Sequence, residues 1–218
     1  MPKLVIAIDG PSGAGKGTVA RAVATRLGYR HVDSGAMYRA VGWKAIRDGV
    51  PFDDEERVAR LAGRSHIEVT ATTVTIDEAD VTRVIRTPEI DRAAAAVARL
   101  PKVRAVLVER QRELGAGGAI VMEGRDIGTV VFPNADYRFY FDADIATRAL
   151  RRWRDLKAAG KPMPLSQVKK EIKARDMTDI KRKTGALKVG RGAIVLDTSG
   201  LTIPQTAVRI LKIIGKRR

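Results

Sequence analysis

The stretch Leu4-Val-Ile-Ala-Ile-Asp-Gly-Pro-Ser-Gly-Ala-Gly-Lys-Gly-Thr18 decides the fold. Its apolar run from Leu4 to Ile8 is typical of a strand buried on both faces of a parallel sheet. A glycine-rich turn follows, and apolar residues then recur at helical spacing from Val19 to Leu27, where Gly28 ends the helix. A strand, a glycine loop and a helix N-terminus in this order predict a cradle for phosphate groups.

The loop contains the residue types that phosphate binding requires. Its glycines allow positive φ and bring backbone N–H groups close to an anion. Lys16 can reach the β- and γ-phosphates of a nucleotide, and the Thr18 hydroxyl can ligate Mg²⁺. Because Gly17 separates the lysine from the threonine, the pattern resembles the version found in nucleoside monophosphate kinases; a glycine-rich turn with an unrelated lysine is the alternative. The expected ATP-binding residues are Gly10, Pro11, Ser12, Gly13, Ala14, Gly15, Lys16, Gly17 and Thr18.

The composition bounds the class of protein. The 218 residues suffice for one domain, and 44% of them are hydrophobic and 30% charged. The absence of cysteine excludes disulfides and cysteine nucleophiles, and the two histidines make a histidine metal site improbable. No apolar run approaches the roughly 20 residues that span a bilayer, and the N-terminus lacks a signal-peptide pattern. We expect a single domain over residues 1–218, in the cytoplasm, with no membrane partner and monomeric.

The formal net charge of +16 allows three interpretations. It is compatible with nucleic-acid binding, and it also suits an enzyme that concentrates polyanionic substrates in an arginine-lined cleft. A basic bias shared by all proteins of the host is the third. Most of the excess lies between Arg148 and Arg191, on predicted helices, and aromatic residues for base stacking make up only 5% of the chain. We therefore expect nucleotides, and no specific nucleic acid, as partners.

Apolar strands alternate with helical patterns along the chain. Five strands are expected near residues 4–8, 30–32, 119–122, 137–141 and 193–196. Helices are expected to begin at a Ser34 cap, at Asp53 or Asp54, at Thr87-Pro88, at Pro101, at Asp144, at Leu165 (running to about Lys183) and at Thr202-Ile203-Pro204. The alternation predicts an α/β fold with a five-stranded parallel sheet and helices on both faces. Together with the phosphate loop, it indicates a fold of the P-loop NTPase type.

Two segments interrupt this alternation. Residues 66–77 alternate at period two and predict a small hairpin, which belongs to an inserted subdomain over about 64–98. Two basic helices flank the turn Gly160–Pro164, and we expect the region 152–170 to form a short lid. The second basic helix places Arg175, Asp179 and Arg182 on one face, at spacings of four and three residues.

Five motifs in register resemble those of bacterial cytidylate kinases. They are Asp33-Ser-Gly-Ala-Met-Tyr-Arg39, Ile85-Arg-Thr-Pro-Glu89, Pro101-Lys-Val-Arg104, Gly124-Arg-Asp-Ile-Gly-Thr-Val-Val-Phe-Pro133 and Arg175…Asp179…Arg182. The resemblance covers essentially the whole chain, including the insert. It implies ATP-dependent phosphorylation of CMP and dCMP by in-line transfer of the γ-phosphoryl group, with Mg²⁺ as cofactor and ATP, CMP and dCMP as partners.

The resemblance also implies which side chains bind the acceptor. Guanidinium groups suit this role because each can grip a phosphate with two parallel hydrogen bonds. The structural alternatives are a solvated helix charge for Arg39, an ion pair for Arg125 and Asp126, and a surface pair for Asp179 and Arg182. The acceptor-binding residues are Ser34, Tyr38, Arg39, Arg104, Arg125, Asp126, Asp179 and Arg182.

Further residues are implied for the transfer itself. Lys16 and the arginines of the lid region would neutralise charge on the transferring phosphoryl group. Arg151 could replace Arg152, because helix faces read from sequence carry register errors. Mg²⁺ would bind Thr18 and, through a water molecule, Glu123. The expected catalytic residues are Lys16, Arg125, Arg148, Arg152 and Arg175.

Three positions depart from the family pattern. Ala95 stands where a serine hydroxyl commonly meets the cytosine edge, so base selection could be weaker. Glu123 replaces the usual aspartate before Gly-Arg-Asp and sets the carboxylate one methylene further out. The turn from Ile76 to Val81 lacks a frequent glycine. The open alternatives are a P-loop kinase for UMP, AMP or shikimate, and a basic nucleic-acid-binding protein with a regulatory nucleotide site.

Overall fold

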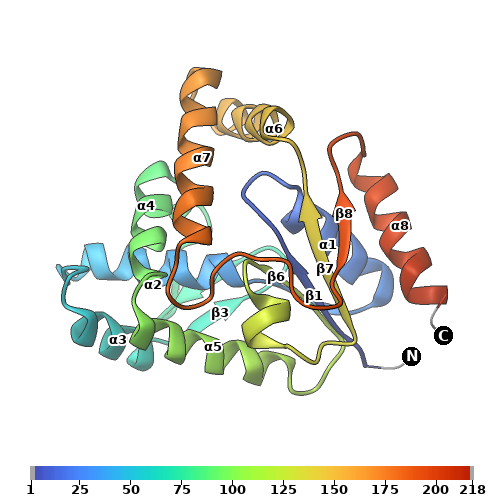
Figure 1. The fold of residues 1–218 in the computed structure, drawn as a ribbon. Helices are drawn as coiled ribbons and strands as arrows, with labels where there is room; N and C mark the ends of the chain where they lie inside the picture. The colour runs from blue at the N-terminus through green and yellow to red at the C-terminus, as the bar shows by residue number, and fades with distance from the viewer. Residues whose placement is uncertain (1–2, 217–218) are drawn as a thin grey trace.

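The computed structural model describes residues 3–216 and confirms the predicted α/β fold (Figure 1). Five parallel strands form one sheet in the order β2-β6-β1-β7-β8, so the first strand lies at its centre. The strands are β1 (Val5–Asp9), β2 (Arg30–Asp33), β6 (Ile120–Gly124), β7 (Tyr137–Asp142) and β8 (Ile194–Asp197). All five predicted strands are present.

The helices follow the predicted pattern with two corrections. The predicted Ser34 cap is wrong: Asp33 is the N-cap and accepts from the Ala36 N–H, which makes Ser34 the first helical residue. The second basic helix ends at Ile180, before Lys183. The helices are α1 (Lys16–Leu27), α2 (Ser34–Arg47), α3 (Glu55–Arg64, capped by Asp54), α4 (Pro88–Val97), α5 (Pro101–Gly115), the π-helical turn η1 (Ile127–Val131), α6 (Ile145–Ala158), α7 (Leu165–Ile180) and α8 (Ile203–Lys216).

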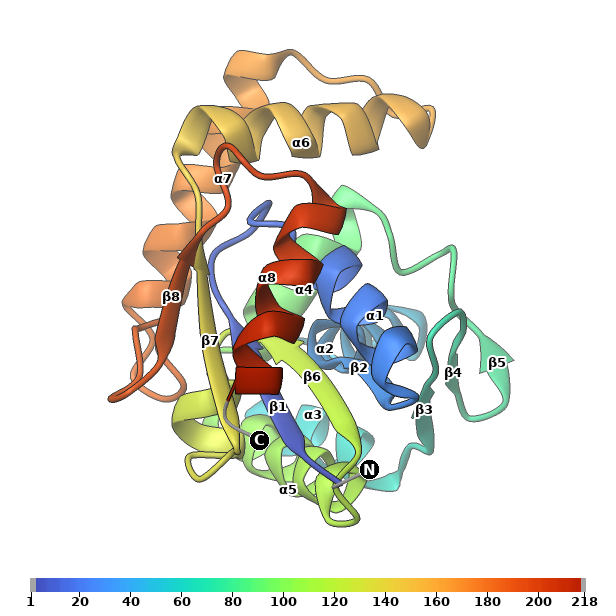
Figure 2. The ribbon, with the colours of Figure 1, turned by 90° about the vertical axis from the view of Figure 1, so that its right-hand side faces the viewer.

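Helices cover both faces of the sheet. On one face, α1 and α8 pack on Ile6, Ile8 and Phe139, while the opposite face buries Ala7 and Met122 beneath α5 and η1. Burying apolar area on both faces is the main stabilising term for such a sheet. Figure 2 shows α1 and α8 side by side over the strands. The sheet therefore holds the carboxyl ends of β1, β2 and β6 in fixed relative positions.

The insert contains the predicted hairpin. β3 (Ile67–Val69) pairs antiparallel with β4 (Val74–Ile76), and the short β5 (Ala79–Asp80) extends this second sheet. The turn that lacks glycine contains two non-glycine residues at positive φ, Asp77 and Glu78. The Asp77 carboxylate accepts from the His66 N–H and pairs with Lys44, which stabilises this left-handed backbone.

The acceptor-side core is larger than the segment 64–98. Its buried residues come from α2, α3, the β3–β4 hairpin, α4 and α5, for example Val41, Val58, Ile76, Val97 and Leu107. A separate small apolar cluster joins α6 to α7 through Ala149, Leu156, Val168 and Ile172, and we call these two helices the helical hairpin. Figure 1 shows α7 standing beside α4, with α6 lying across its upper end.

Candidate functional site

A cavity of about 650 Å³ opens at the carboxyl ends of β1, β2 and β6, where open α/β sheets bind ligands. One wall is the phosphate loop, and the other contains side chains of the acceptor side and of α7 with the loop that follows it. The predicted site residues that line the cavity are Ser12, Gly13, Gly15, Lys16, Gly17, Thr18, Ser34, Tyr38, Arg39, Arg104, Arg125, Asp126, Arg175 and Arg182, together with Glu123.

The phosphate loop has the backbone that its glycines predict. Gly10, Gly13 and Gly15 have φ of 147°, 77° and 85°, and a Cβ on Gly10 would overlap the backbone carbonyl of Phe141. The first helical residue, Lys16, is 5% exposed, and its Nζ donates to the Pro11 carbonyl at 2.9 Å. Burial and the charge of Arg125 lower the pKa of Lys16 to about 7. A bound phosphate would favour the charged form of this amine.

Thr18 and Glu123 fit a magnesium site. Thr18 is exposed to the cavity, and a side chain on Gly17 would begin 3.0 Å from Oε1 of Glu123. Burial and the neighbouring carboxylate of Asp33 raise the pKa of Glu123 to about 7. A buried carboxylate and a hydroxyl that line the same cavity suit a cation that keeps part of its water shell. The longer side chain of Glu123 reaches the start of α1, so its departure from aspartate is compatible with this role.

The acceptor wall contains a buried ion pair. Arg104 pairs with Asp126, and its Nη1 donates to the Tyr38 hydroxyl at 3.3 Å. Burial raises the pKa of Tyr38 to about 12, so the phenol keeps its proton. Nearby, the Ser34 hydroxyl donates to the Glu123 carbonyl at 2.8 Å. The ion pair with Asp126 fixes the guanidinium of Arg104 at the cavity.

The position of Ala95 differs from that of its neighbours. Half-buried Ala95 is not among the residues that line the cavity, whereas Ala94 and Ala98 line it.

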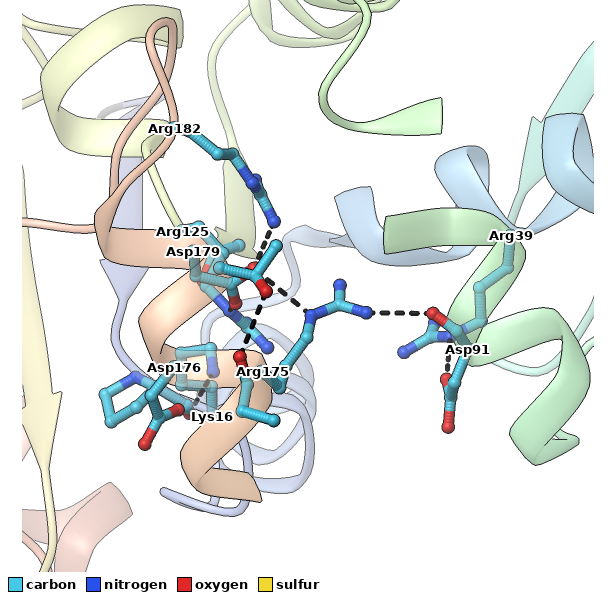
Figure 3. Close-up of polar contacts among 12 residues, drawn as sticks. Lys16, Arg39, Asp91, Arg125, Arg175, Asp176, Asp179 and Arg182 are labelled. Carbon is cyan, nitrogen blue, oxygen red and sulfur yellow. Dashed lines mark hydrogen bonds and ion pairs between the residues drawn. The ribbon is translucent and has the colours of Figure 1, made fainter. Parts of the chain in front are cut away.

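Asp179 collects three arginines at the edge of the cavity. Its fully buried carboxylate accepts from Nε of Arg125 at 2.8 Å and Nε of Arg175 at 3.1 Å, and it also pairs with Arg182 (Figure 3). Burial opposes ionisation of Asp179, but the three guanidinium groups outweigh it and lower the pKa. Asp179 itself is not a lining residue. Its carboxylate aligns three cations at the edge of the cavity.

The carboxylate of Asp33 holds Arg39 in place, as that of Asp179 holds its three arginines. Asp33 pairs with Arg39 at 3.3 Å and with Arg86 at 3.2 Å. Burial alone would raise the pKa of Asp33, but the two guanidinium groups hold it well below its usual range. Asp33 and Arg86 were not predicted as site residues, although both belong to motifs that resemble those of the family. Arg39 also contacts Asp91, a further residue that was not predicted.

Two predicted catalytic arginines are not among the lining residues. Arg148 is buried; it donates to the Ala143 and Ser12 carbonyls and pairs with Asp176 at 2.7 Å, so it supports the phosphate loop from behind. Arg152 pairs with Asp91 at 2.6 Å. Its alternative, Arg151, donates instead to the Thr198 carbonyl at 2.6 Å. The register of α6 therefore directs Arg152, and not Arg151, toward the acceptor side.

A phosphate loop faced by a wall of arginines on a five-stranded parallel sheet defines a P-loop kinase. The family model described as cytidylate kinase matches residues 6–216. The chain belongs to the cytidylate kinase family.

Curated relatives agree with this assignment. The cytidylate kinase of Caldanaerobacter subterraneus is 43% identical, covering 97% of this chain and 94% of its own. The cytidylate kinase of Desulfitobacterium hafniense is 44% identical, covering 98% and 94%. The crystal structure of an uncharacterized protein from Eubacterium ventriosum shares the fold with a TM-score of 0.55, at 14% identity and 99% coverage of each chain. No helix within residues 3–216 is both long and apolar enough to cross a membrane.

Proposed function

We propose that the enzyme transfers the γ-phosphoryl group of ATP to CMP and dCMP, with Mg²⁺ bound at Thr18 and, through water, at Glu123. The observation that carries this proposal is that one cavity has the phosphate loop on one side and Arg39, Arg125, Arg175 and Arg182 on the other. Two anions can bind opposite each other there, and the family assignment names the acceptor. We also propose that the enzyme is a cytoplasmic monomer.

Each wall has a part in the transfer. The phosphate loop and Lys16 would bind the donor phosphates, and Arg39 with the Asp179 cluster would bind the acceptor phosphate. This arrangement holds the two reacting oxygens in line and neutralises charge that develops between them. Mg²⁺ supplies further neutralisation when it is bound. No protein nucleophile is needed, which agrees with a chain that has no cysteine.

The alanine wall favours one variation on this function. Ala94 and Ala98 line the cavity without offering a hydroxyl to a base, and Ala95, which does not line it, stands where the resemblance implies a serine. A base edge that meets no matching hydrogen-bonding group is poorly discriminated. Turnover with UMP is therefore the second candidate, on the same site and by the same mechanism.

The test is ADP formation from Mg²⁺–ATP with CMP, dCMP, UMP and AMP, alongside shikimate and no-acceptor controls. Turnover confined to CMP and dCMP supports the proposal. Comparable turnover with UMP retains the mechanism and assigns relaxed specificity to the cavity wall formed by Ala94 and Ala98. No turnover with any acceptor would contradict the proposal, and salt-sensitive binding to DNA or RNA would then favour the nucleic-acid alternative.

A further inference from the structure

Asp91, in the first turn of α4, contacts three arginines. Its Oδ1 accepts from Nε of Arg39 at 3.2 Å, and its Oδ2 accepts from Nη2 of Arg152 at 2.6 Å. Its backbone carbonyl accepts from Nη1 of Arg175 at 2.8 Å. Figure 3 shows Arg39 and Arg175 reaching Asp91 from opposite sides. One residue therefore connects guanidinium groups from α2, α6 and α7.

These contacts join two parts of the molecule that have separate cores. The residues around Asp91 on α4, such as Ile90 and Ala94, pack in the acceptor-side core, whereas α6 and α7 share the apolar cluster of the helical hairpin. Among the hydrogen bonds and ion pairs found within residues 3–216, those of Asp91 are the ones that link α4 to the hairpin. Together with the Arg125–Asp179 pair, these contacts hold the helical hairpin over the acceptor side.

Asp91 acts from behind the cavity wall. Arg39 and Arg175 line the cavity, but Asp91 and Arg152 do not. A guanidinium held by a carboxylate or a carbonyl loses less freedom when it binds a phosphate, because part of its rotamer entropy has already been given up. The same contacts keep the helical hairpin closed over the acceptor side, and this closure excludes water from the transferring phosphoryl group.

We propose that Asp91 is a positioning residue for phosphoryl transfer, which directs Arg39 and Arg175 into the cavity and, through Arg152, holds the helical hairpin against the acceptor side. This inference rests on the proposed kinase function and names a residue that neither the sequence motifs nor the resemblance had marked. Asp91 touches no substrate; it acts through the arginines.

Steady-state kinetics of Asp91→Asn test the proposal. The kcat with CMP should fall about 10-fold, because misplaced groups cost this much or more, while the KM for ATP stays within about twofold of the wild type. ADP released per CDP formed should rise above one, because water competes for the phosphoryl group. Asp91→Glu should restore tight coupling. Glu89→Gln removes one negative charge from an exposed position on the same helix and should leave all parameters unchanged.

Two kinetic outcomes would overturn the role of Asp91. Unchanged kinetics would make its ion pairs incidental. A lower KM for CMP at unchanged kcat would show that Asp91 only competes with the acceptor phosphate for Arg39. The double variant Asp91→Asn with Arg152→Gln tests whether the two residues act through their shared ion pair. If they do, the double variant should lose no more activity than the worse single variant. Additive losses of activity would contradict the link.

A distance measurement needs no turnover. The chain has no native cysteine, so Glu89→Cys and Arg154→Cys place spin labels on α4 and α6 alone, at exposed positions. Asp91→Asn should lengthen and broaden the distance distribution between them, and an unchanged distribution would overturn the role of Asp91 in holding the hairpin. Loss of the proposed function would instead appear as a wild-type enzyme with no turnover and a normal distance response.

Discussion

Lys16 is buried at the start of α1, where burial and the charge of Arg125 lower its pKa to about 7. Its one hydrogen bond in the described structure runs to the Pro11 carbonyl. A cation kept from water in this way binds an incoming phosphate strongly, since little solvation remains to be removed. Replacing it should change the chemistry of the site far more than the stability of the fold.

Lys16→Ala should lower kcat by about 10² to 10³-fold, the usual loss for one preorganised charge that stabilises a transition state. The melting temperature should remain within a few degrees of the wild type, because the substitution removes a charge that is costly to bury. The measurement is CDP formation alongside a thermal melt. An unaffected rate would refute the role of Lys16 in phosphate binding.

ADP binding without Mg²⁺ at pH 8 should be accompanied by the uptake of about one proton. With a pKa of about 7, Lys16 is mostly neutral at pH 8 in the free enzyme, and the bound phosphates raise its pKa so that it takes up a proton. Calorimetry in two buffers with different ionisation enthalpies measures this number. Lys16→Ala should show no uptake; equal uptake in both proteins would place the proton elsewhere.

Which site residues could be predicted depended on how far apart their partners lie in sequence. Arg175 and Asp179 lie in α7 and Arg182 follows two residues after its end, so their short spacing alone brought them together, and the structure confirms that they pair. Arg125 joins the same carboxylate from 54 residues away, and Asp91 meets Arg152 from a distance of 61 residues. No local pattern encodes those meetings, which depend on how the sheet places its loops.

At the scale of elements, the loop after α7 is packed against the acceptor wall. Gly185 has a φ of 63°, and a Cβ there would overlap the guanidinium of Arg104 and the carboxylate of Asp126. Glycine is required both by the backbone and by the ion pair beneath it. The loop therefore packs directly against the buried pair.

Gly185→Ala should reduce kcat/KM for CMP by about 10-fold or more, because the new Cβ would overlap the Arg104 guanidinium and displace it by about 1 Å or more. The KM for ATP should change little. Gly49→Ala is the matched control, since Gly49 has the same φ of 63° and nothing within 4 Å of its Cβ position. Both variants should lose about 1 kcal/mol of stability through backbone strain. Equal kinetics for the two would contradict the packing argument.

Elements were predictable where a local signal marks them. Thr87 followed by proline, and Asp144 before an amphipathic run, fixed the starts of α4 and α6. Ser34 was mistaken for a cap because Asp33, which precedes it, caps equally well. The turn η1 was missed because its apolar sequence has no helix signal, and a long-range contact stabilises it: the Ile127 and Gly128 N–H groups donate to Asp9 at 2.8 and 2.7 Å.

At the scale of the whole molecule, the net charge of +16 should affect how fast nucleotides arrive. We expect kcat/KM for CMP to fall several-fold between about 0.05 and 0.5 M salt, because screening shortens the reach of the field, while kcat changes little. Sucrose at matched viscosity is the control for diffusion. A salt dependence confined to kcat would contradict electrostatic steering.

The hydrogen bonds from η1 to Asp9 limit which segments of this fold can be exchanged with those of related proteins. Asp9 ends the strand that leads into the phosphate loop, and the segment that it anchors begins directly after Arg125 and Asp126. Donor and acceptor loops are thus fastened to one carboxylate at the centre of the sheet. The β3–β5 hairpin has its own strand pairing, but its buried residues belong to the acceptor-side core, so it could be exchanged between related kinases only where the new side chains fit that core. The Gly124–Phe132 loop could be transplanted only together with the first strand.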